Sequence, residues 1–138
     1  CIRDRDKKVI QWNKLYKVLN DNLNKQNGIF FPNRDSDEYF VGSSIQFRID
    51  SLNNEQIKSF INNCKARGVD LKWFGNEKPV AYTSRYDSWK YLDNIPRLAN
   101  TLRILGKTFD MRIPLTFTVQ DCNIISKIII EELQKVQN

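Results

Sequence analysis

The residues best suited to bind a ligand lie in one aromatic and polar stretch, which contains Arg85, Tyr86 and Trp89. Arginine has a planar guanidinium that can donate two parallel hydrogen bonds to a carboxylate or a phosphate. Large aromatic side chains on a surface loop are costly unless they pack against something or bind it. The stretch therefore predicts a ligand-binding loop, and an internal ion pair from Arg85 to Asp87 or Asp93 is the structural alternative.

Two further arginines, Arg48 and Arg112, occupy strand positions that point away from the expected apolar side. Side chains at such positions can line an open sheet face near a ligand, or they can simply be solvated. The solvated interpretation is favoured for both arginines.

Two groups of carboxylates are close enough in sequence for acid–base chemistry, Asp35 with Asp37 and Glu38, and Glu131 with Glu132. Such chemistry needs an apolar setting that separates the pKa values of the two carboxyl groups. Neither group has such a setting in the sequence. We expect the first to lie in a polar loop and the second on a solvated helix face.

The three cysteines, Cys1, Cys64 and Cys122, are widely spaced and form no CxxC pair, which favours a reducing, cytoplasmic setting. The chain contains no histidine, so catalysis by Ser-His-Asp or Cys-His and zinc sites with histidine ligands are excluded within it. Without a base to activate them, Cys64 and Cys122 are expected to be buried structural thiols. No metal site is predicted.

The tripeptide Gly106-Lys107-Thr108 looks like the end of a phosphate-binding P-loop. That motif needs a glycine five residues before the second glycine, and the residue there is Thr101. Gly106 is therefore better explained as the end of a helix.

The chain has 138 residues, of which 41% are hydrophobic and 28% charged, as in an ordinary globular protein. This length predicts one domain. Lys and Arg number 22 against 16 Asp and Glu, so the net charge is +6. Basic and acidic residues are interleaved, which favours a solvated surface over a nucleic-acid interface. No apolar stretch is long enough to span a membrane, and no signal peptide is evident.

Apolar spacing predicts a first helix over residues 7–25. A second helix is expected to begin after Asn53, which forms a capping pattern with Gln56, and to end at Gly68.

A third helix is expected to open at Pro96 and to stop at Gly106. Thr118 and Asp121 form a capping signature at the start of a last helix. Its buried side is expected to carry five apolar residues, Ile124, Ile125, Ile128, Ile129 and Leu133.

Alternation of apolar and polar residues predicts three strands, over 40–50, 69–73 and 110–117. Val41 is placed on the packed side of the first. Pro114 lies in the third, which favours an edge position or a bulge for that strand. A short apolar piece at 29–31 precedes all three.

The fold class is therefore α+β, a small and mostly antiparallel sheet with helices packed on one face. Residues 1–138 form a single domain, a helix over 7–25 followed by an α/β unit over 29–138. The first residue is Cys rather than Met, so we expect the chain to be the C-terminal part of a longer protein.

Three strings in this order of elements are similar to a known family, FVGSSIQF at 40–47, RGVDLKWFG at 67–75 and DMRIPLT at 110–116. With the final helix, they resemble the C-terminal small domain of fold-type I pyridoxal-phosphate-dependent aminotransferases. The likeness is greatest to the DegT-type sugar-aminotransferase superfamily, and it extends from Lys7 to Val136.

The resemblance implies an aminotransferase-like protein whose cofactor lysine, pyridine-nitrogen aspartate and most phosphate contacts belong to a large domain outside this chain. Lys72, on the second expected strand, is interpreted as exposed rather than catalytic. By position in the family, Arg112 and Arg85 are the candidates to bind a substrate carboxylate, with Tyr86 and Trp89 beside Arg85.

The leading hypothesis is thus a non-catalytic small domain that contributes substrate contacts and domain closure. No cofactor is expected in this chain, and pyridoxal phosphate is implied for the parent protein. Its expected partners are the large domain and a second copy in a homodimer. The alternative is a small basic module that binds nucleic acid or an acidic protein through its cations and the aromatic rings of Trp73, Tyr86 and Trp89.

Overall fold

The computed structural model describes residues 2–78, 87, 91 and 93–138, with side chains from residue 4 onward. Within these residues, four helices and three strands follow one another: α1 (Ile2–Leu23), β1 (Ser44–Arg48), α2 (Asn54–Ala66), β2 (Lys72–Trp73), α3 (Ala99–Leu105), β3 (Thr108–Arg112) and α4 (Val119–Gln137). The apolar piece at 29–31 contributes an isolated bridge between Phe30 and Arg48 rather than a strand.

The three strands form an antiparallel sheet in the order β1-β3-β2, which confirms the predicted fold class. The prediction for the third strand was wrong in its position. That strand is central, ends at Arg112 and contains no bulge, and Pro114 comes after it. A proline there removes no ladder hydrogen bond, which resolves the conflict between Pro114 and a central strand.

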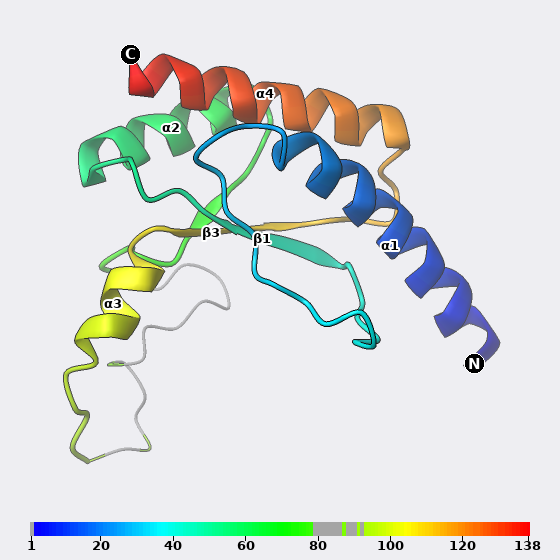
Figure 1. Cartoon of the computed structure of the whole chain (residues 1–138), viewed down its shortest axis with the longest axis horizontal. Helices are drawn as coiled ribbons and strands as arrows, with labels where there is room; N and C mark the ends of the chain where they lie inside the picture. The colour runs from blue at the N-terminus through cyan, green and yellow to red at the C-terminus, as the bar shows by residue number, and fades with distance from the viewer. Residues whose placement is uncertain (1, 79–86, 88–90, 92) are drawn as a thin grey trace.

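Figure 1 shows α1, α2 and α4 gathered on one side of the sheet, with α3 on the other side near one end of the strands. The expectation that helices cover one face therefore holds for three helices of the four. Among the helices that the structure describes, none has the length and apolar composition to cross a membrane.

The core lies between the sheet and the three helices. Ile45, Phe47 and Ile49 alternate inward on and just after β1, and all three are buried. The Phe47 ring stacks on the Phe109 ring of the central strand at 5.6 Å between centroids. Phe60 of α2 contacts the Phe109 ring edge-on. Such pairs stabilise a core beyond their buried area. Val41 is exposed, contrary to the prediction, because β1 begins only at Ser44.

Both predicted capping boxes are present. Asn53 and Gln56 satisfy each other's backbone N–H groups at the start of α2, and Thr118 and Asp121 do so at the start of α4. Gly68 follows the end of α2 with φ of 86°, a conformation that favours glycine.

Three helix boundaries or faces differ from the predictions. The first helix begins at Ile2, earlier than the predicted residue 7, and α3 begins at Ala99, after Pro96. The Ile124 side chain is 51% exposed instead of buried. Cys122, Ser126 and Glu132 are on the buried side of α4, because its approach to α1 and α2 rotates the buried face away from Ile124.

The segment before β1 is held against α1 at Gly42. The Asn13 side-chain oxygen accepts a hydrogen bond from the Gly42 N–H at 2.7 Å, and its amide donates one to the Phe40 carbonyl at 3.1 Å. A β-carbon at Gly42 would lie only 2.5 Å from Cβ of Tyr16, which is itself buried. The contact therefore requires glycine.

We predict that Gly42→Ala destabilises the domain by about 1–3 kcal/mol, because the added methyl group forces α1 away from this segment. The measurement is urea denaturation followed by tryptophan fluorescence. Asn62→Ala, on the exposed side of α2, is the control and should change stability by less than about 0.5 kcal/mol. Equal stability of Gly42→Ala and the parent chain would contradict the close contact.

Candidate functional site

The sheet face opposite α1, α2 and α4 is polar, and it is the candidate functional site. Among the helices that the structure describes, only α3 adjoins this face, which we call the open face (Figure 1). Antiparallel register places seven side chains on it: Ser44, Gln46 and Arg48 from β1, Lys72 from β2, and Thr108, Asp110 and Arg112 from β3. Each alternates with core residues, so the same ladder that buries the aromatic rings fixes these groups on the other side.

Asp110 is at the centre of this face. Register pairs it with Gln46 on one side and Lys72 on the other. The Gln46 amide donates to the Asp110 carboxylate at 3.0 Å and to the Ser44 hydroxyl at 3.2 Å. Asp110 is only 7% exposed, so this hydrogen bond supplies a partner that a buried carboxylate needs.

The cations of the open face differ in how they are partnered. The Arg48 Nε lies 2.9 Å from an Asp50 carboxylate oxygen. Arg112 is exposed and forms no ion pair with any residue that the structure describes, and the same holds for the half-buried Lys72. An unpaired guanidinium on a rigid strand can receive a carboxylate or a phosphate without breaking an internal contact.

The structure describes only one of the four predicted site residues. Arg112 lies on the open face, as its strand position predicted. Arg85, Tyr86 and Trp89 lie outside the described residues, so their roles stay predictions, as does the alternative ion pair of Arg85.

The sequence did not predict that Asp110 and Gln46 form a hydrogen-bonded pair. Each occupies an outward position in its strand, but only the register of β1 against β3 brings them together, and the sequence carries no signal for that register.

The other candidates mostly have structural roles. Asp35, Asp37 and Glu38 are exposed, and Glu38 pairs with Arg34 at 2.7 Å, as expected for a polar loop. Cys64 and Cys122 are buried free thiols, as predicted. Burial, with a smaller contribution from the Glu132 charge, raises the pKa of Cys64 to about 12, so this thiol is no nucleophile near neutral pH. Within the described part of the chain, no cluster of acidic or cysteine side chains could hold a metal ion.

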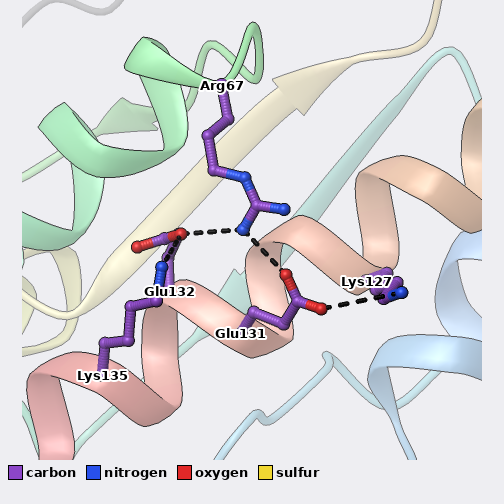
Figure 2. Close-up of polar contacts among 5 residues, drawn as sticks. All are labelled: Arg67, Lys127, Glu131, Glu132 and Lys135. Carbon is purple, nitrogen blue, oxygen red and sulfur yellow. Dashed lines mark hydrogen bonds and ion pairs between the residues drawn. The ribbon is translucent and has the colours of Figure 1, made fainter.

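The prediction of a solvated Glu131–Glu132 pair was wrong for Glu132, which is 2% exposed. Figure 2 shows one Arg67 guanidinium nitrogen, at the end of α2, bridging both carboxylates of α4 at 2.8 Å each. Lys135 also binds Glu132, at 2.7 Å. These bonds from Lys135 and Arg67 lower the pKa of Glu132. A buried carboxylate with two cations holds α2 to α4, which is a structural role.

Comparison with solved structures shows a likeness of fold. No protein-family model matches the sequence, and no curated protein is significantly similar to it. The crystal structure of the aminotransferase TlmJ from Streptoalloteichus hindustanus is similar over 98% of this chain, with a TM-score of 0.78 and 11% sequence identity. The chain spans 34% of the length of that protein. The domain therefore has an aminotransferase-like α+β fold.

The described residues do not fit pyridoxal phosphate. A covalent site needs a lysine and a carboxylate at a pocket, with free backbone N–H groups for the phosphate. Lys72 and Asp110 lie opposite each other on a sheet face, at partnered positions of β2 and β3, and not in a pocket. The two pockets that adjoin α3 are lined by neither residue. Lys107, in the second pocket, donates its ammonium to the Leu52 carbonyl.

We predict that the domain loses stability in acid through Glu132. Its folded pKa lies below the ordinary value of 4.5, so its ion pairs stabilise the fold above that pH. Their contribution is lost as the pH falls through the lowered folded pKa. Urea denaturation at a series of pH values should show this loss, and Glu132→Gln should reduce it while lowering stability near neutral pH.

Glu131→Gln is the matched control, because it removes the half-exposed partner of the same Arg67 and leaves Glu132 intact. It should keep the acid sensitivity of the parent chain. An unchanged pH dependence in Glu132→Gln would contradict the assignment.

Proposed function

We propose that this chain is the C-terminal small domain of a pyridoxal-phosphate-dependent aminotransferase-like protein of the DegT-type sugar-aminotransferase superfamily. It contributes substrate contacts and domain closure and is not catalytic alone. The observation that carries the proposal is the fold likeness to an aminotransferase that is about three times longer than the region matched.

In this proposal the cofactor and its lysine belong to a large domain, which is the main partner of this chain, with a second copy as a further partner in a homodimer. When bound there, pyridoxal phosphate supplies the electron sink for amino-group transfer. The open sheet face meets the substrate. The buried free thiols Cys64 and Cys122 suit a cytoplasmic protein.

Arg112 is the described side chain best suited to bind a substrate carboxylate. It stands on the central strand and is exposed, and the residues described offer it no internal anion. Asp110, two positions before Arg112 on the same strand, lies between Gln46 and Lys72. The hydrogen bond from Gln46 to Asp110 fixes the side chains at the centre of the face. The face carries more cationic than anionic side chains, so a substrate carboxylate would offset its excess positive charge.

The claim that the cofactor lysine lies in another domain is tested by incubating this chain with pyridoxal phosphate. The product is reduced with borohydride, and modified lysines are located by peptide mass spectrometry. We expect only low, scattered labelling of exposed lysines, because no described lysine has the surroundings of a cofactor site. A single stoichiometric adduct would overturn the claim that the cofactor lysine lies elsewhere.

The substrate role is tested in the longer protein that joins this domain to the cofactor lysine. Arg112→Gln should raise KM for a carboxylate-bearing amino donor by roughly 10- to 100-fold, the loss expected for a charge-assisted hydrogen bond, and should change kcat less. Arg5→Gln, on the exposed surface of α1, should leave both constants unchanged. Equal constants for Arg112→Gln and the parent protein would contradict this role.

A further inference from the structure

A pocket of about 370 Å³ opens beside α3 on the same side of the sheet as the open face. This volume is in the range of small-molecule sites. Its apolar lining comes from four phenylalanines and two α3 residues: Phe30, Phe31, Phe47, Phe74, Ile104 and Leu105.

Two of these wall residues are left accessible to solvent, Phe30 at 48% and Ile104 at 43%. Phe47 borders the pocket from within the sheet, because its side chain is buried on the core side, where the Phe31 ring lies 6.2 Å from it. Apolar side chains that gather around a cavity and remain exposed are typical of a binding site. The wall chemistry favours a flat, apolar ligand.

Arg48 gives the pocket a cation. Its guanidinium carbon lies 5.6 Å from the centre of the Phe30 ring, so the charge sits against the aromatic wall. Its Nε is buried and lies 2.9 Å from an Asp50 oxygen, but without the direction that a hydrogen bond requires. No described residue bonds the two terminal nitrogens. These N–H groups remain available to an anionic ligand.

Two polar side chains complete the lining, and neither adds a charge. Thr108 uses its hydroxyl to donate to the Ile104 carbonyl at 2.7 Å. Gln46 donates its amide N–H groups to Asp110 and Ser44, which leaves its carbonyl oxygen as an acceptor. Arg48 is therefore the one charged side chain among the residues described around this pocket.

We propose that this pocket binds a flat aromatic ring that carries a carboxylate or a similar anionic group. The ring contacts the phenylalanine wall and the anion pairs with Arg48. The proposal goes beyond the proposed function, because it needs neither the cofactor nor another domain. Gln46 lines the pocket and also binds Asp110 of the open face, so an occupant would lie next to the surface that carries Arg112.

The test is a titration of the chain with 2-naphthoate, followed by amide chemical shifts in NMR spectra. We expect saturable shifts confined to the pocket, at Phe31, Arg48, Phe74, Leu105 and Thr108, with Kd of about 1 mM or below. The neutral analogue 2-naphthylmethanol should bind at the same place at least several-fold more weakly. Arg48→Gln should weaken 2-naphthoate to the level of the neutral analogue and leave the latter unchanged.

A second variant separates binding from folding. Ile104→Glu places a carboxylate on the pocket rim at a half-exposed position of α3 and should weaken 2-naphthoate at least 10-fold with the fold retained. Ile124→Glu makes the same change on the exposed side of α4 and should have no effect. Shifts that do not saturate, shifts centred elsewhere, or equal effects of the two variants would overturn the proposal.

Discussion

The structure depends on the central position of β3 between two antiparallel neighbours. Because every residue of this strand is paired on at least one side, its alternation fixes a core side and an open side for the whole sheet. Phe109 lies on the first, where it stacks on Phe47 and receives the edge of Phe60. Asp110 lies on the second, beside Gln46. A shift of one residue would exchange the two, so core packing and the polar face are specified together.

Interactions between near neighbours were predictable from the sequence. The capping boxes at Asn53 and Thr118 involve residues three positions apart, and both occur as expected. The outward position of Arg112 also follows from a local pattern. Glu132 could not be interpreted in this way, because a glutamate beside Glu131 and near Lys135 is typical of a solvated helix. Its burial depends on Arg67, 65 positions away, which no spacing rule connects to it.

The same limit applies to the candidate site. Alternation assigns Gln46 and Asp110 to outward positions, but their hydrogen bond depends on a register that only packing sets. Pro114 shows the converse error, since a proline inside an alternating pattern was interpreted as part of the strand. The strand ends at Arg112, and the pattern continues past it because Ile113 still packs into the core. Burial can thus extend an alternation beyond the hydrogen-bonded ladder.

The unequal covering of the two sheet faces links the fold to the proposals. Three helices shield the apolar face, so that face is committed to stability (Figure 1). On the other side, α3 lies near one end of the sheet, where its Ile104 and Leu105 line an apolar pocket together with Phe30 and Phe74. The remaining surface carries Arg112 and Lys72, which form no ion pair within the part of the chain that the structure describes. If this face binds a ligand as proposed, side chains on it could change without altering the packing of Phe47 and Phe109 on the other side of the sheet.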